Sequence, residues 1–184
     1  MPELTPPEPP LADDAIALRG WTDADVAALV EMFSDDEIAR WTHAPSPYRE
    51  RDAIEWLVAQ RAFARRGERL ALAVVAASDP DALLGSIELR LREGCRGEFG
   101  YAVARWARRR GVGSRALRLY ADWAFALGGC ERLEVVVHPE NAASLRLVES
   151  VGFRREGVLR SYGVMRGSRV DLVMFSLLPG ELRG

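Results

Sequence analysis

Apolar and polar positions along this chain show two periodicities, one of two residues and one of about 3.6 residues. Alternating or continuous apolar runs bounded by turn residues predict strands. We expect strands over Ala15–Arg19, Leu70–Ala76, Leu83–Leu91, Glu98–Val103, Arg132–Val137, Phe153–Tyr162 and Val170–Leu178. We expect connections at a Ser78–Asp81 turn, a Glu93–Gly97 hairpin and the Arg166–Ser168 turn of a last antiparallel pair.

The periodicity of about 3.6 residues predicts helices between these strands. The expected helices run from a Thr22 cap to Phe33, and over Ser34–Arg40, Arg49–Arg66, Gly111–Leu127 and Asn141–Val151. Gly67, Gly128 with Gly129, and Gly152 are placed to end them. Within the third helix, Ile54, Leu57, Val58 and Phe63 are spaced to face a core. This order of elements predicts an α+β fold: one mixed, mostly antiparallel sheet with helices on both faces.

Composition narrows the class of protein. The 184 residues suffice for a single domain with a substantial core, and a net charge of −2 argues against a nucleic-acid partner. Cys95 and Cys130 have neither metal-site nor disulfide-framework spacing. The N-terminus lacks the features of a signal peptide, and no stretch is apolar enough to span a membrane. We expect a cytoplasmic protein without a metal, with a flexible proline-rich tail over residues 1–13 and a domain over residues 14–180.

One stretch carries candidate chemistry: Arg108-Arg109-Arg110-Gly111-Val112-Gly113-Ser114, between a predicted strand and a predicted helix. The first amides of a helix have no partner inside it, and the helix dipole favours negative charge there. Glycine removes the Cβ that would keep a ligand from the backbone. Arginine guanidinium groups suit phosphate oxygens. The stretch therefore predicts a pyrophosphate site.

Other phosphate-binding loops fit this stretch less well. The lysine of a P-loop is missing, and the dinucleotide fingerprint would place Ala116 where its third glycine belongs. The motif by itself leaves open a nucleotide-binding protein of another fold and a solvated basic turn.

The motif Arg108-x-x-Gly111-x-Gly113 after a strand resembles the acyl-CoA signature of the GNAT superfamily of N-acyltransferases. Further blocks match in the family's order: Gly85–Arg90, Glu98–Val103, His138–Ser144 and Val151–Gly157. The similarity is greatest to the ribosomal-protein N-terminal acetyltransferase-like branch, of the RimJ/RimL type. The matching region covers roughly Ala15 to Leu178.

This resemblance implies a sheet that is splayed between the Glu98–Val103 and Arg132–Val137 strands, with the pantetheine arm of acetyl-CoA in the gap. It assigns the pyrophosphate to the Arg108–Ser114 backbone, with Arg109 and Arg110 equally compatible with solvent. It also assigns Tyr101, Ala102, Val103, Asn141 and Ser144 to the cofactor. Backbone groups of Tyr101–Val103 would pair with pantetheine like an added strand. The Val103 N–H would polarise the thioester carbonyl.

The catalytic residues are assigned with alternatives. The resemblance gives Ser144 the role of protonating the leaving thiolate, and the alternative is a serine on the helix surface. Asn141 is also a good helix N-cap residue, which is compatible with a role at the cofactor. An attacking ammonium must lose a proton, and Glu98, or else Glu88, is the candidate base. The alternation of side chains along a strand does not determine which glutamate faces the site, because a bulge moves the following side chains to the opposite face. Either glutamate can instead pair with an arginine on a solvated face of the sheet. Some members of the branch have a glutamate where this chain has Ser161-Tyr162-Gly163.

The resemblance implies an acyltransferase that uses acetyl-CoA as co-substrate and a primary amine as acceptor, either a protein N-terminus or a small molecule. The alternative is a non-catalytic GNAT-like module that binds CoA or a protein partner. The sequence leaves the acceptor, the length of the acyl group and the oligomeric state open, with a homodimer as one option.

Overall fold

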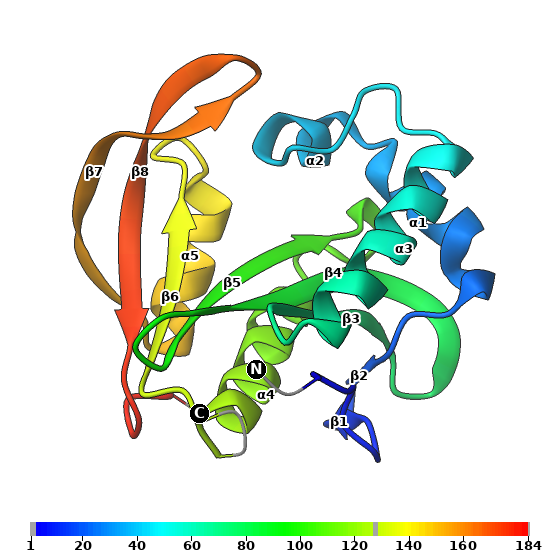
Figure 1. The fold of residues 1–184 in the computed structure, drawn as a ribbon, viewed down its shortest axis with the longest axis horizontal. Helices are drawn as coiled ribbons and strands as arrows, with labels where there is room; N and C mark the ends of the chain where they lie inside the picture. The colour runs from blue at the N-terminus through cyan, green and yellow to red at the C-terminus, as the bar shows by residue number, and fades with distance from the viewer. Residues whose placement is uncertain (1–2, 127–128, 184) are drawn as a thin grey trace.

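Eight strands form one sheet within residues 3–126 and 129–183, the part of the chain that this computed structural model describes (Figure 1). They are β1 (Leu11–Ala12), β2 (Ile16–Arg19), β3 (Arg69–Ala76), β4 (Asp79–Arg92), β5 (Arg96–Val103), β6 (Arg132–Val137), β7 (Arg154–Met165) and β8 (Ser168–Leu177). Their order is β1-β2-β3-β4-β5-β6-β8-β7. Every neighbouring pair is antiparallel except β5 and β6.

Helices cover both faces of the sheet, which confirms the predicted α+β class. They are α1 (Val26–Phe33), α2 (Asp36–Trp41), α3 (Glu50–Arg65), α4 (Val112–Ala126) and α5 (Ala142–Val151), with 3-10 turns at Asp23–Asp25 and Arg105–Ala107. Helix α3 packs on β3 on one face, and α4 packs on β2, β4 and β5 on the other (Figure 1).

The sheet splays between its two parallel strands. Strands β5 and β6 pair at Arg96 with Arg132, Gly97 with Leu133, and Glu98 with Glu134. Beyond Glu98, β5 continues along β4 while β6 continues along β8, so the two strands diverge (Figure 1). Because they pair at their N-terminal ends, the gap opens toward their C-terminal ends. Helix α4 follows the C-terminus of β5 and α5 follows that of β6, so both helices begin at the open end.

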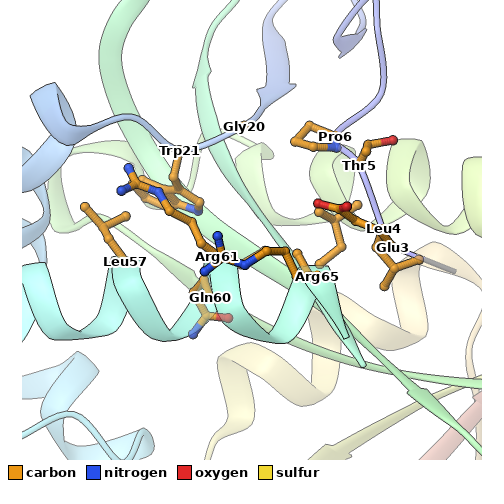
Figure 2. Close-up of a pocket in the computed structure, with 13 residues that line it drawn as sticks. Glu3, Leu4, Thr5, Pro6, Gly20, Trp21, Leu57, Gln60, Arg61 and Arg65 are labelled. Atoms are coloured by element: carbon orange, nitrogen blue, oxygen red, sulfur yellow. The ribbon is translucent and has the colours of Figure 1, made fainter. Parts of the chain in front are cut away.

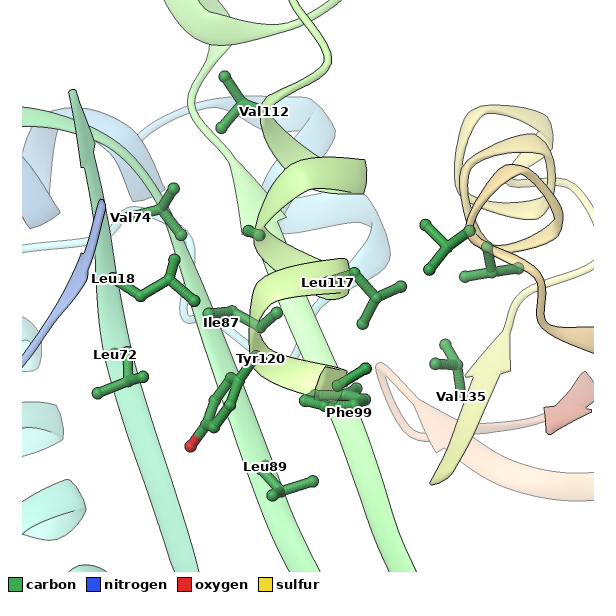
Figure 3. Close-up of a cluster of buried hydrophobic side chains, with 14 of the residues drawn as sticks. Leu18, Leu72, Val74, Ile87, Leu89, Phe99, Val112, Leu117, Tyr120 and Val135 are labelled. Atoms are coloured by element: carbon green, nitrogen blue, oxygen red, sulfur yellow. The ribbon is translucent and has the colours of Figure 1, made fainter. Parts of the chain in front are cut away.

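One apolar face of α4 fills the core against the sheet (Figure 3). Leu117 and Tyr120 are fully buried, and the Tyr120 ring meets the Phe99 ring edge-on at 5.4 Å. The Tyr120 hydroxyl donates to the Leu70 carbonyl at 2.9 Å, so this buried phenol is satisfied. Each such side chain contributes about 1.5–3 kcal/mol by burial. This packing fixes α4, and with it the loop before α4, on the sheet.

The predicted core face of α3 is partly wrong. Leu57 is buried, but Ile54 and Val58 are 46% and 55% exposed. A narrower stripe that includes Ala53 and Leu57 packs against Leu29 of α1, so only one apolar row of α3 is used. This row suffices to pack α3 against β3 and α1, and the side that carries Ile54 and Val58 faces solvent.

Other boundaries also differ from expectation. The predicted Ser78–Asp81 turn is wrong, because the turn occupies residues 77–78 and β4 begins at Asp79. Register shifts between Val74 and Ala76 let β4 begin this early. Strand β1 was not expected and pairs with β2 through Leu11 and Leu18. The predicted helix end at Leu127 and Gly128 lies outside the described residues.

Gly152, which ends α5, is expected to tolerate no side chain. Its φ is +116°, and an added Cβ would collide with the Glu181 carbonyl oxygen. We expect Gly152→Ala to lower the free energy of unfolding by about 2–3 kcal/mol, measured in urea. Gly94→Ala is the control, because Gly94 has a φ of +71° with no atom within 4 Å of the added Cβ. It should lose only about 1–2 kcal/mol from backbone strain. Equal losses would contradict the steric explanation.

Candidate active site

The loop before α4 exposes backbone at the open end of the splay. Arg109 and Gly111 have left-handed backbones, with φ of +61° and +75°, and α4 begins directly afterwards at Val112. A Cβ built on Gly111 would meet nothing nearer than Arg115 Nε at 3.9 Å. Gly111 is exposed and leaves open space directly before α4, as an anion site at a helix N-terminus requires.

At position 113, glycine is required for close packing and not for an open backbone. It is buried, and an added Cβ would lie 2.6 Å from Leu147 Cδ1 of α5 and 3.2 Å from Val103 Cγ2 of β5. The glycine therefore lets α4 approach α5 and β5 closely. Val112 is likewise buried, whereas Ser114 turns back and donates its hydroxyl to the Gly111 carbonyl at 2.9 Å.

Arg108 contacts α2. Its guanidinium pairs with Asp35 at 3.1 Å and Glu37 at 2.7 Å. Asp35 caps α2 by accepting from the amides of Glu37 and Ile38. Burial raises the pKa of the Asp35 carboxyl, but the hydrogen bonds from Arg108 and the two amides outweigh it, so the pKa lies below its ordinary value. Arg109 and Arg110 are exposed.

A hydrogen bond crosses the splay. The Tyr101 hydroxyl of β5 lies 2.6 Å from Ser144 Oγ of α5. Asn141 is the N-cap of α5, and its side chain accepts from the Ser144 amide at 3.1 Å. Burial raises the pKa of Tyr101 to about 12, although the Ser144 hydrogen bond acts in the opposite direction. Sequence reasoning assigned only the backbone of Tyr101 and missed its phenol, because nothing local reveals a partner 43 residues away.

The edge of β5 that faces the gap is open along its last residues. Ala102 and Val103 are half-buried and pair with Ser86 and Gly85 of β4. Within the described residues they have no register partner on β6. A strand in an antiparallel ladder turns only part of its backbone groups toward one neighbour, so the others point into the gap. This is the geometry that an added strand needs.

The two candidate bases lie in one row of ion pairs. Glu88 pairs with Arg69 at 3.3 Å and with Arg90, whereas Glu98 pairs with Arg90 at 3.2 Å and Arg92 at 2.9 Å. Both carboxylates share one sheet face, because Glu98 lies opposite Arg90 in the register. Alternation along β5 turns the Tyr101 side chain to the other face. Both glutamates therefore lie across the sheet from the Tyr101–Ser144 pair.

A second ionic group holds β6 to β7 and was missed by sequence reasoning. Arg132 bonds Glu134 at 2.7 Å and Glu156 at 2.6–2.9 Å, and Ser176 donates to Glu156 at 2.6 Å. The Arg132 and Ser176 hydrogen bonds lower the pKa of Glu156 to about 2. These contacts stabilise the half of the sheet that lies beyond the splay.

Helix α2 also reaches across to the second half of the molecule. Arg40 pairs with Glu140 at 3.3 Å, and the Trp41 ring lies 5.2 Å from the His138 ring. Arg166, in the β7–β8 turn, donates to the Ala39 carbonyl. Of the aromatic residues near this segment, Tyr48 is buried and stacks on Phe33, so it belongs to the core.

A cavity of about 260 Å³ lies elsewhere, between α3, β3 and the segment Glu3–Pro6 (Figure 2). It is lined by Trp21, Gln60, Arg61 and Arg65 among others, and includes none of the predicted site residues. No group of three or more His, Cys, Asp or Glu within the described ranges is arranged to hold a metal. None of the helices in those ranges combines the length and hydropathy that a bilayer crossing requires.

The chain belongs to the GNAT acetyltransferase family. The family model "Acetyltransferase (GNAT) domain" matches residues 16–154. The uncharacterized N-acetyltransferase YoaA of Bacillus subtilis is 30% identical over 174 residues, 92% of this chain and 97% of that protein. The protein is therefore a GNAT family N-acetyltransferase.

Solved structures show the same fold. A putative ribosomal-protein-serine acetyltransferase from Vibrio cholerae superposes with a TM-score of 0.84 at 22% identity, covering 95% of this chain and 100% of that one. Mycobacterium smegmatis RimJ, in complex with CoA-disulfide, superposes with a TM-score of 0.81 at 24% identity, covering 92% and 84%. The GNAT fold expected from the sequence is confirmed.

The contact of Arg108 with α2 predicts a measurable change. In Arg108→Gln, the pKa of Asp35 should rise, because burial is no longer offset by the guanidinium. A carboxyl whose pKa is lower in the folded state than in the unfolded state stabilises the fold at pH above its unfolded-state pKa of about 3.9. That stabilisation is lost as the pH falls through the folded-state pKa. The variant should therefore lose about 1 kcal/mol at neutral pH and less in acid. Carboxyl NMR titration and urea unfolding measure both effects.

Arg105→Gln is the matched control, since the one ion pair of Arg105 among the described residues is exposed and long, at 3.8 Å to Glu31. Its loss should be close to zero. An unchanged Asp35 titration in Arg108→Gln would contradict the assigned contact.

Proposed function

We propose that this protein transfers an acetyl group from acetyl-CoA to a primary amine by direct attack of the amine on the thioester. The observation that carries the proposal is the meeting of three features at one end of the splay. These are the open edge of β5, the exposed N-terminus of α4 at Gly111, and the Ser144 hydroxyl. The complex of RimJ with CoA-disulfide supports the same ligand class.

The residues present fit acetyl-CoA. The α4 amides around Gly111 and Gly113 would hold the pyrophosphate, aided by Arg109 and Arg110. Arg108 could bind the pyrophosphate only if its guanidinium left Asp35 and Glu37. The open backbone of Tyr101–Val103 would bind the pantetheine amides. Asn141 would contribute by positioning Ser144, because its side-chain oxygen accepts a hydrogen bond from the Ser144 amide.

The chain's own groups supply the chemistry. The Val103 N–H would donate to the thioester oxygen and stabilise the charge that develops there. Ser144 would donate its proton to the departing sulfur. Glu98, or else Glu88, would accept the proton of the incoming ammonium, directly or through water, and must first exchange an arginine contact.

The acceptor is proposed only as a class: a protein N-terminus or a small-molecule amine. The Vibrio cholerae relative is named as a ribosomal-protein-serine acetyltransferase, which supports the first. A second candidate function is a CoA-binding module without turnover, favoured by the arginine partners that occupy both candidate bases.

Release of free thiol from acetyl-CoA, assayed across peptides with free N-termini, amino sugars, polyamines and amino-acid derivatives, tests the proposal. Turnover with one class supports the enzyme and names its acceptor. CoA binding without turnover on any amine supports the module. Displacement of CoA by ATP or NAD would contradict both.

The phosphate assignment predicts a charge effect at Gly111. Gly111→Glu should weaken acetyl-CoA binding at least about 100-fold by calorimetry, since like charges at 4 Å repel by about 4 kcal/mol at an effective dielectric constant of about 20. Gly111→Gln has the same shape and backbone strain without the charge, so it should bind clearly more tightly than Gly111→Glu. Equal affinities of the two variants would contradict a phosphate at this position.

The base assignment predicts a pH-dependent loss. Glu98→Gln should lower turnover about 100-fold at neutral pH and recover partly at high pH, where more amine arrives deprotonated. Glu88→Gln is the matched control, because it also removes a partner of Arg90. A large loss in Glu88→Gln alone would move the role to Glu88. Small losses of turnover in both variants would indicate that water or a backbone carbonyl accepts the proton of the ammonium.

A further inference from the structure

The Tyr101–Ser144 hydrogen bond connects elements that the sheet itself does not join. Tyr101 lies on β5 beyond its last register pair with β6, and Ser144 lies in the first turn of α5, which packs on β6. The 2.6 Å separation of the two oxygens is short for a hydroxyl pair. Ser144 is thus held twice, through its amide by Asn141 and through its hydroxyl by Tyr101.

The chemistry of the two hydroxyls determines which one donates. A phenol is a much stronger acid than an aliphatic alcohol, and its oxygen is a weaker acceptor. The separation is compatible with either direction, and on this chemical ground we assign the donor role to Tyr101, which leaves the serine hydrogen for another acceptor. Burial keeps the phenol protonated, since the pKa of Tyr101 is raised to about 12.

We propose that Tyr101 is a positioning residue of acetyl transfer: its phenol donates to Ser144 Oγ and directs the hydrogen of Ser144 at the sulfur of acetyl-CoA. This role rests on the proposed function. A serine hydroxyl that is free to rotate offers its hydrogen in several directions, of which only one meets the sulfur. Fixing that rotor removes an entropic cost from the transition state.

The transfer step balances without a proton from Tyr101. The amine nitrogen bonds to the carbonyl carbon, the carbon–sulfur bond breaks, and its electron pair stays on sulfur. The ammonium has first lost one proton to the base. The nitrogen releases a second proton to solvent as the amide forms, and solvent returns one to Ser144 in place of the proton that Ser144 gives to the sulfur, so one proton is released in all. Tyr101 keeps its proton and only orients the donor.

A merely structural bridge makes different predictions. If the hydrogen bond served only to join β5 to α5, its loss would lower the melting temperature and weaken cofactor binding. A positioning role instead changes the chemistry at sulfur while cofactor affinity is retained.

The test is the ionisation of CoA bound at saturation, followed by the ultraviolet absorbance of its thiolate as pH is raised. We expect the bound thiol to ionise at lower pH in the wild type than in Ser144→Ala, because the directed hydroxyl stabilises the thiolate. Tyr101→Phe, which removes only the hydroxyl, should shift the titration in the same direction as Ser144→Ala. The double variant should match Ser144→Ala alone, since Tyr101 acts only through Ser144.

Turnover gives a second reading. Tyr101→Phe should lower kcat about tenfold while KM for acetyl-CoA stays within about twofold, and Ser144→Ala should lower kcat further. Tyr120→Phe is the matched control, because it also removes a buried phenolic hydrogen bond, to the Leu70 carbonyl. It should lower the melting temperature and leave the thiol titration unchanged.

Each outcome decides the proposal. A wild-type thiol titration in Tyr101→Phe, or additive shifts in the double variant, would overturn the positioning role while leaving the acetyltransferase function intact. Failure of the wild-type protein to bind CoA by calorimetry would overturn the proposed function first, and the role of Tyr101 with it.

Discussion

The parting of β5 from β6 after three register pairs is the constraint on which the rest of the molecule depends. Past Glu98, strand β5 continues along β4 up to Val103, and β6 continues along β8 up to Val137, so the two strands diverge from each other. A parallel pair that opens at its C-terminal ends places the following helix N-termini at the same opening. Backbone donors, an unpaired strand edge and the Ser144 hydroxyl are thereby gathered without any long excursion of the chain.

Charged side chains cluster at the closed end of the splay. Glu98 and Glu134 are side by side on parallel strands, an arrangement that repels unless cations intervene. Arg90 and Arg92 of β4 pair with Glu98, and Arg96 and Arg132 pair with Glu134. Of these arginines, Arg90 and Arg92 also occupy Glu98, one of the carboxylates proposed for proton transfer. Glu98 would have to give up an arginine contact before it accepts a proton.

Arg108 connects the two sides of the site. It belongs to the loop proposed for the pyrophosphate, but its guanidinium holds the N-cap of α2 through Asp35. Helix α2 in turn meets the second half-sheet through Ala39, Arg40 and Trp41. A ligand that drew Arg108 away would remove one of the contacts that fix α2. The loop and the segment on the opposite side of the gap are thus physically linked.

The sequence by itself determined most of the elements, their order and the family, because local periodicity and glycine-punctuated turns depend on neighbours in the chain. It also located the Gly111 loop, where glycine adopts a left-handed backbone without a steric cost. It did not reveal β1 or the early start of β4 at Asp79. It did not determine which apolar residues of α3 are buried, because Ile54 and Val58 look locally the same as Leu57. Only the tertiary structure decided that Gly113 serves helix packing, that Arg108 contacts α2, and that the Tyr101 phenol meets Ser144. These facts depend on side chains from distant segments, whose meeting is set by the sheet order and the splay.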